Sequence, residues 1–229
     1  MAKKKVKSRW KKESPEDLKR RALRLSRKLR KLYSGTKTAL RFDNDFQLVV
    51  ATILSAQCTD DQVNRVTPVL FKQYGTAMAL ARAKTAAIEK IIHSTGFFRQ
   101  KTKSILALSK DLEERFGGIV PESMEELTSL PGVGRKTANL VRAEAFGLPG
   151  IVVDTHFRRL SQRLALVETS DPTKIEFRIA DLLPDSHWTD FSTALIWHGR
   201  RICYAHKPDC PKCPVLSDCP FGLDATGKG

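Results

Sequence analysis

Apolar residues recur every three or four positions along most of this 229-residue chain, which is the period of an α-helix with one buried face. The first such stretch begins at Ser14 and Pro15, a capping residue followed by proline at the first helical position. Its apolar positions are Leu18, Ala22, Leu25, Leu29 and Leu32. No stretch alternates apolar and polar residues in the way a half-buried strand would, so the pattern predicts an all-α protein.

Short breaks at glycine or proline separate the later periodic stretches from one another. We expect helices at about residues 45–55, 61–74, 85–94, 99–116, 123–130, 137–146, 155–166, 173–183 and 190–202.

A helix, a tight turn and a second helix are predicted at about residues 123–146, and the stretch from Leu130 to Asp154 includes the turn and the second helix. Pro131 ends the first helix, and Gly132 and Gly134 permit backbone angles that other residues avoid. The turn of Gly132, Val133, Gly134 and Arg135 is expected to present backbone N–H groups beside the positive end of the second helix. Such a concavity binds a phosphate without any side chain.

Lys136 is the candidate nucleophile, because the helix dipole and Arg135 both disfavour an extra proton on its amine. A helix of about ten residues climbs about 15 Å, and residues 148–153 in extended form cover about 20 Å, enough to bring Asp154 back beside Lys136. Two plainer interpretations compete. Asp154 is a good helix N-cap, and a lone lysine after a glycine turn is usually a phosphate contact. A P-loop is excluded, because Arg135 stands where that motif needs glycine.

The formal net charge of +15 is concentrated near the N-terminus. Residues 1–41 hold 17 Lys and Arg against three acids, a net of +14, which leaves +1 for the rest of the chain. We expect residues 1–13 to form a basic disordered arm that adds salt-sensitive affinity for nucleic acid; a solubilising tail is the alternative. No apolar run is long enough to span a membrane.

Four of the five cysteines lie within 17 residues: Cys203, Cys210, Cys213 and Cys219. Prolines between them disfavour helix, so this loop cannot hold itself together by packing. Four thiolates at these spacings can close around one metal centre, and their chemistry leaves zinc and an iron-sulfur cluster equally open. Cys58 stands apart and is expected to be an inert buried thiol.

The sequence LPGVGRKTAN followed by VDTH, the segment LSAQCTD at Leu54 to Asp60 and the four-cysteine tail together resemble the endonuclease III family of DNA glycosylases. The resemblance runs from about Phe42 to Cys219. It implies a bifunctional enzyme that removes oxidised pyrimidines from duplex DNA and then cuts the strand at the abasic site by β-elimination. Lys136 and Asp154 would be catalytic, and the four cysteines would hold one four-iron, four-sulfur cluster.

The resemblance also implies two domains: a six-helix domain at residues 38–148, which contains the hairpin, and an iron-sulfur cluster domain formed by residues 14–37 with 149–229. Within the first, Gln57 and a residue of the Gly96-Phe97-Phe98 turn would fill the space left by a flipped nucleotide. Adjacent aromatics at a turn are core residues by default, and the alternative is a ring exposed as a wedge. Many relatives carry a smaller aliphatic residue where Phe97 would be the wedge.

The expected partner is duplex DNA with a damaged base or an abasic site, bound by a monomer in the cytoplasm beside the nucleoid, or in the nucleus of a eukaryote. One rival is an adenine-mismatch glycosylase of the same superfamily. Those enzymes lack lysine at the hairpin position and carry a further C-terminal domain, so Lys136 and an end at Gly229 disfavour it. A second rival is a non-catalytic DNA-binding protein that needs neither Lys136 nor Asp154.

Overall fold

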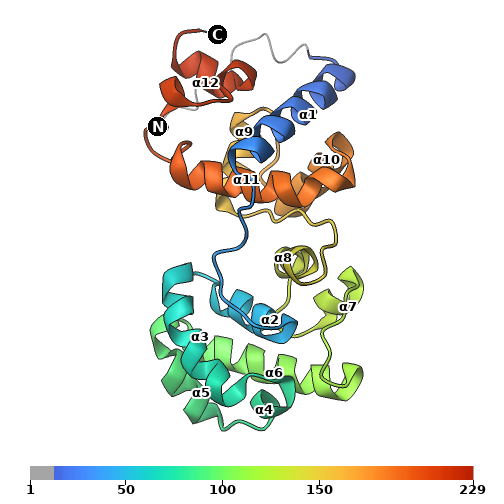
Figure 1. Ribbon diagram of the computed structural model, residues 1–229, viewed down its shortest axis with the longest axis vertical. Helices are drawn as coiled ribbons and strands as arrows, with labels where there is room; N and C mark the ends of the chain where they lie inside the picture. Colours follow the sequence, from blue (N-terminus) through green and yellow to red (C-terminus); the bar gives the residue numbers. More distant parts are fainter. Residues whose placement is uncertain (1–12, 229) are drawn as a thin grey trace. The chain divides into compact units, whose positions relative to one another are not determined.

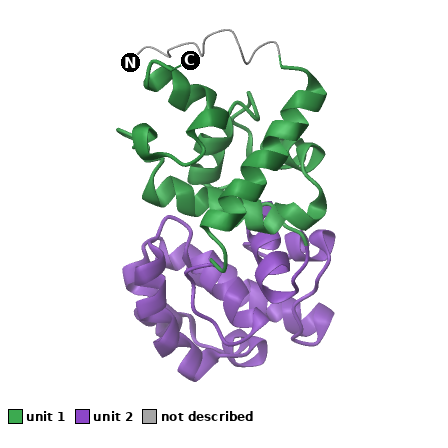
Figure 2. Cartoon of the chain, turned by 45° about the horizontal axis from the view of Figure 1, so that its top comes forward, with its two compact units in different colours: residues 1–37, 149–229 green, residues 38–148 purple. Residues whose placement is uncertain are grey.

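The computed structural model describes residues 13–228, and within this range every regular element is helical (Figure 1). The predicted all-α class is therefore confirmed. The chain divides into two compact units (Figure 2), with unit 1 drawn from residues 1–37 and 149–229 and unit 2 from residues 38–148. Residues 1–12 of the predicted basic arm lie outside the described range. None of the described helices is long and apolar enough to cross a membrane.

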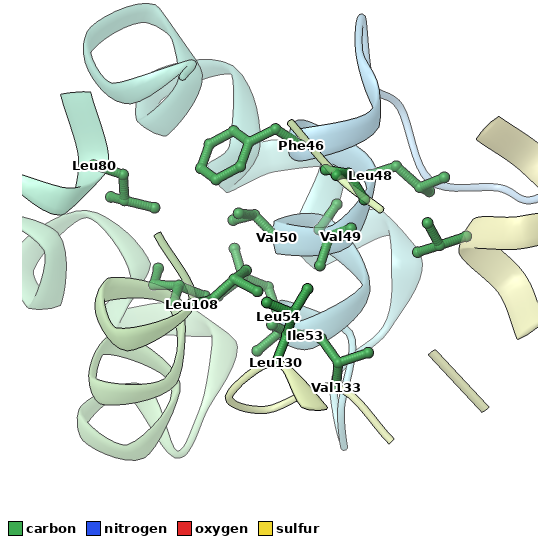
Figure 3. Packing of buried hydrophobic residues seen from close by; sticks show 14 of the residues in the cluster. Phe46, Leu48, Val49, Val50, Ile53, Leu54, Leu80, Leu108, Leu130 and Val133 are labelled. Atoms are coloured by element: carbon green, nitrogen blue, oxygen red, sulfur yellow. The ribbon is translucent and has the colours of Figure 1, made fainter. Parts of the chain in front are cut away.

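Unit 2 is built around α2 (Asp45–Leu54), in which nine of the ten residues are buried. Figure 3 shows its apolar side chains packed among residues of the surrounding helices. The short helix α4 (Ala77–Ala81) was not predicted, since five residues are too few to display a helical period. The other elements of this unit are α3 (Asp60–Tyr74), α4 (Ala77–Ala81), α5 (Thr85–Ile92), the 3-10 turn η2 (His93–Thr95), α6 (Phe98–Phe116), α7 (Met124–Ser129) and α8 (Arg135–Ala145).

Unit 1 packs α1 (Pro15–Leu32) against α11 (Trp188–Arg201), which in turn packs on α9 (Thr155–Arg163). Ser14 caps α1 and Pro15 occupies its first turn, as the sequence predicts. The cysteine tail contains no α-helix between its first and last cysteine, but Pro220 begins an unpredicted helix directly after Cys219. The remaining elements are α10 (Pro172–Leu182), α12 (Pro220–Ala225) and the 3-10 turns η3 (Asp185–His187), η4 (Cys210–Lys212) and η5 (Leu216–Asp218).

Arg21 is a buried cation on the apolar face of α1, with 1% of its surface exposed. Its guanidinium donates to the carbonyl oxygens of Leu164 at 2.6 Å and Asp218 at 3.3 Å, and it pairs with the Glu13 carboxylate at 2.8 Å. A guanidinium has five donors, so several acceptors are needed to bury it. Glu13, which the sequence assigns to the end of the basic arm, is thus paired with Arg21 at the start of the described range.

Candidate functional site

The turn between α7 and α8 is anchored in the core of unit 2 by its two apolar residues. Leu130 and Val133 are buried, and Figure 3 shows both beside Ile53 of α2. The Val133 N–H donates to the Leu130 carbonyl at 3.1 Å, which closes the turn. Gly132 has a φ of +79°, and a Cβ there would lie 3.0 Å from Cβ of Ser104, so the position favours glycine in both conformation and space.

The helix after this turn begins without a side-chain cap. Gly134 is the N-cap of α8, and it has no side chain to accept from the first-turn amides, whereas Asn44, Ser123 and Asp154 cap the helices that follow them. The first N–H groups of a helix have no partner within the helix. Gly132 and Gly134 are also exposed, so the turn offers backbone donors to an anion at the positive end of the α8 dipole.

Lys136 is exposed in the first turn of α8. The helix begins at Arg135, two residues before the predicted start at residue 137, so Lys136 lies within the helix rather than ahead of it. Its side chain is therefore carried by a rigid element, one residue after Arg135 and two after the turn glycine Gly134.

Asp154 is the N-cap of α9, and its Oδ1 accepts from the backbone N–H of Phe157 at 2.7 Å. The approach to this cap is fixed by α11: Ser192 Oγ accepts from the Val152 N–H at 2.8 Å and donates to the Val152 carbonyl at 3.1 Å. The capping interpretation is correct. It engages one carboxylate oxygen, which leaves a second for other chemistry. Asp154 belongs to unit 1 and Lys136 to unit 2, and their predicted pairing stays a prediction.

Gln57 and Phe97 share an unusual backbone conformation in unit 2. Their φ angles are +52° and +48°, in the left-handed region that costs a non-glycine residue about 1–2 kcal/mol. Both side chains are exposed, Phe97 by 67%. The default interpretation of Phe97 as a core residue is therefore wrong, while its neighbour Phe98 packs against the core. Exposed residues with a strained backbone of this kind are typical of functional loops.

The four tail cysteines line one cavity in unit 1. Two are buried: burial raises the pKa of Cys219 to about 12 and also raises that of Cys210. Buried thiols of this kind become thiolates when a metal centre takes the place of their protons. Among residues 13–228, no three His, Cys, Asp or Glu side chains converge at the spacing of ligands to a single ion.

Hydrogen-bond donors also face these sulfurs. Arg163 Nη1 donates to Cys203 Sγ at 3.2 Å, and the Gly222 N–H donates to Cys219 Sγ at 3.3 Å. Donors that surround the sulfurs suit thiolate ligands. Sequence reasoning missed Arg163, because it lies 40 residues before Cys203 and no local pattern connects the two. Cys58 is partly buried against the core of the other unit.

Residues 50–185 match the family model of the HhH-GPD superfamily base excision DNA repair protein. The chain is 51% identical to endonuclease III of Synechocystis sp. over 203 residues, which are 88% of this chain and 93% of the relative. It is 41% identical to endonuclease III of Bacillus subtilis over the same share of both chains.

Two of the solved structures that share this fold are complexes with DNA. One is a non-covalent complex of endonuclease III with DNA, with a TM-score of 0.86, 37% identity and coverage of 92% of this chain and 99% of that one. The other is a trapped covalent intermediate of endonuclease III with DNA, also with a TM-score of 0.86 and 37% identity, covering 91% and 98%.

Proposed function

The chain belongs to the endonuclease III family of the HhH-GPD superfamily, and from this membership we propose that it excises oxidised pyrimidines and cleaves the abasic strand through a Schiff base on Lys136. The resemblance read from the hairpin, LSAQCTD and tail motifs is confirmed. The protein is a DNA glycosylase and AP lyase of base excision repair.

The observation that carries the proposed nucleophile is the position of Lys136, exposed in the first turn of a helix that starts from an uncapped glycine turn. The exposed amides of this turn would hold a phosphate of the damaged strand. A phosphate held there would place the adjoining sugar next to the first turn of α8. Lys136 is the amine of that turn, which supports its assignment over a role as a phosphate contact alone.

The base must leave the duplex before its C1′ carbon can be attacked, because stacking hides that carbon. In the proposed chemistry the neutral amine of Lys136 forms a bond to C1′ while the glycosidic bond breaks, and the base departs with its bonding electrons. The nitrogen then loses a proton and the C1′–O4′ bond of the sugar ring breaks, with O4′ taking up a proton, which gives the imine. The imine acidifies the C2′ proton, whose loss expels the 3′ phosphate by β-elimination. Asp154 would stabilise positive charge on the sugar and assist proton transfer.

Gln57 and Phe97 would occupy the space that the extruded nucleotide leaves in the stack. Their exposure and their left-handed backbone support this role, because neither residue is placed for packing in the core. Phe97 is larger than the aliphatic residue that many relatives carry at this position. A phenyl ring would therefore fill the gap in the base stack differently from the side chain of those relatives.

Cys203, Cys210, Cys213 and Cys219 would hold one four-iron, four-sulfur cluster. Each cysteine of such a cluster would bind a different iron, and the four cysteines line one cavity here, which supports a shared centre. When bound, the cluster supplies binding energy that orders the tail. Arg163 and the Gly222 amide would donate to its thiolates.

Borohydride trapping tests the proposed mechanism. Reductant added during turnover on DNA with one damaged pyrimidine should join the protein covalently to the DNA, because attack by an amine passes through a reducible imine. Lys136→Gln should abolish trapping and strand cleavage while retaining affinity for abasic DNA, which is held by backbone amides. Trapping that persists in Lys136→Gln would assign the nucleophile to another amine.

A further inference from the structure

Lys101 carries a buried ammonium in the first turns of α6, with 4% of the residue exposed. Its Nζ donates to the carbonyl oxygen of Leu54 at 2.8 Å and to that of Thr95 at 2.8 Å. Among the described residues its hydrogen bonds go to these two carbonyls and to no carboxylate. Burial lowers the pKa of Lys101, although the nearby Cys58 acts in the opposite direction.

Both carbonyls lie at the ends of helical segments, where a cation is favoured. Leu54 is the last residue of α2 and Thr95 the last of η2, so their carbonyls point out of the C-terminal, negative ends. An apolar side chain would fill the same space without the cost of burying a charge. The lysine therefore does something that packing does not require: it joins the C-terminal ends of two separate helical segments.

The two ends that Lys101 joins are those that lead into Gln57 and Phe97. Gln57 follows Leu54 by three residues, in a turn closed by the Cys58 N–H donating to Ser55 at 3.1 Å. Phe97 follows Thr95 by two residues, after Gly96. Both residues have left-handed backbone, a conformation that persists in a non-glycine residue only where the surroundings hold it.

The same end of α6 also supports the hairpin turn. Ser104 lies one helical turn after Lys101, and its Cβ is the atom nearest to where a Cβ on Gly132 would stand. The first two turns of α6 thus contact three loops of unit 2: the loop after α2, the loop before α6 and the hairpin.

We propose that Lys101 is a positioning residue that ties the loops of Gln57 and Phe97 together, so that both side chains enter the duplex as one rigid wedge. This inference rests on the proposed role of those two side chains. It assigns Lys101 no contact with DNA and no part in the chemical step. Its loss should therefore impair opening of the duplex and spare the lyase reaction.

The test compares Lys101→Met with the wild-type holoenzyme on two substrates. A duplex with a damaged pyrimidine beside 2-aminopurine reports opening of the stack by fluorescence, and a single-stranded oligonucleotide with a ready-made abasic site reports the lyase step. Lys101→Met should lose most of the fluorescence change and slow base excision by about tenfold or more, with cleavage of the single strand within about threefold of wild type. Equal losses on both substrates, or none on either, would overturn the proposal.

Two further variants separate the possible causes. Leu112→Ala truncates a fully buried residue of the same helix, and it should lower the melting temperature while leaving the fluorescence change intact. If Leu112→Ala also removes the fluorescence change, general destabilisation explains the effect and the proposal fails. If Lys101→Met does not fold, Lys101→Gln replaces it, because its shorter amide cannot bridge both carbonyls. Wild-type fluorescence in a folded Lys101→Gln would contradict the proposed role of Lys101 in tying the two loops together, which we call the clamp.

Phe97→Ala distinguishes failure of this inference from failure of the proposed wedge. Loss of fluorescence in Phe97→Ala but not in Lys101→Met would retain the wedge and reject the clamp. A normal signal in Phe97→Ala, and also in Gln57→Gly, would reject the wedge and the clamp with it.

Discussion

The carboxylate of Asp154 accepts the backbone N–H of Phe157 at 2.7 Å, so the residue proposed to stabilise charge in catalysis is also the cap of α9. The two roles use different properties of the side chain. A cap needs an acceptor oxygen, and charge stabilisation needs a negative charge.

Asp154→Asn should separate these roles, because asparagine keeps the acceptor and loses the charge. We expect the free energy of unfolding to fall by less than about 1 kcal/mol, while single-turnover base release falls by about 100-fold or more. Asp154→Ala is the matched control: it should lose the charge and also about 1 kcal/mol of stability with the cap. Normal base release in Asp154→Asn would leave Asp154 with its capping role alone.

Gly132→Ala should weaken binding to abasic DNA, because the new Cβ would lie 3.0 Å from Cβ of Ser104 and 3.4 Å from Ile53 and so displace the turn. Gly147→Ala provides the control, since Gly147 has a φ of +64° with nothing within 4 Å of its Cβ position. Both variants should lose about 1 kcal/mol to backbone strain, but only Gly132→Ala should lose DNA affinity. Adding Ser104→Gly should restore part of that affinity, which a double-mutant cycle would measure.

Gln57→Gly should reduce excision without reducing stability. Glycine relaxes the left-handed strain at φ +52° but adds flexibility to the unfolded chain, and the two effects are similar in size. Denaturant unfolding should therefore give a free energy within about 1 kcal/mol of wild type, while single-turnover excision from duplex DNA falls by about tenfold. A large drop in stability would indicate that Gln57 is needed by the fold.

Cys213→Ser should lower the iron content of the purified protein and expose residues 203–228 to proteolysis, because binding energy at such a centre is folding energy. The wild-type protein should be yellow-brown and contain about four irons and four sulfides per chain. Cys58→Ser is the control and should keep its full iron content, since Cys58 packs against the core of unit 2, whereas the four tail cysteines belong to unit 1. Zinc in the wild-type protein would contradict the cluster assignment.

Deletion of residues 1–12 should weaken DNA binding and flatten its dependence on salt. The deletion removes Lys3, Lys4, Lys5, Lys7, Arg9, Lys11 and Lys12 but retains Glu13, the partner of Arg21. For each DNA phosphate that the arm no longer neutralises, the slope of log K against log salt should decrease by about 0.9. Single-turnover cleavage at saturating enzyme should stay unchanged, and a slower chemical step would give the arm a catalytic role.

The helical class and the hairpin could be predicted from sequence because their causes are local. Ser14 and Pro15 start α1 by interactions within one turn, and the glycines on either side of Val133 interrupt two apolar periods at the point where the chain turns. Lys136 follows that turn directly, so its position at a helix start is also a local property. The helices α4 and α12 were missed because each is too short to show an apolar period.

Burial was decided by tertiary structure. Phe97 and Phe98 are adjacent and identical in type, yet one is exposed and the other packs on the core, because the backbone at Phe97 is left-handed. Arg21 is buried by a carbonyl 143 residues away, and Lys101 by one 47 residues away. In sequence both cations are indistinguishable from their solvated neighbours. A charge can be buried only where acceptors converge on it, and such convergence comes from distant segments of the chain.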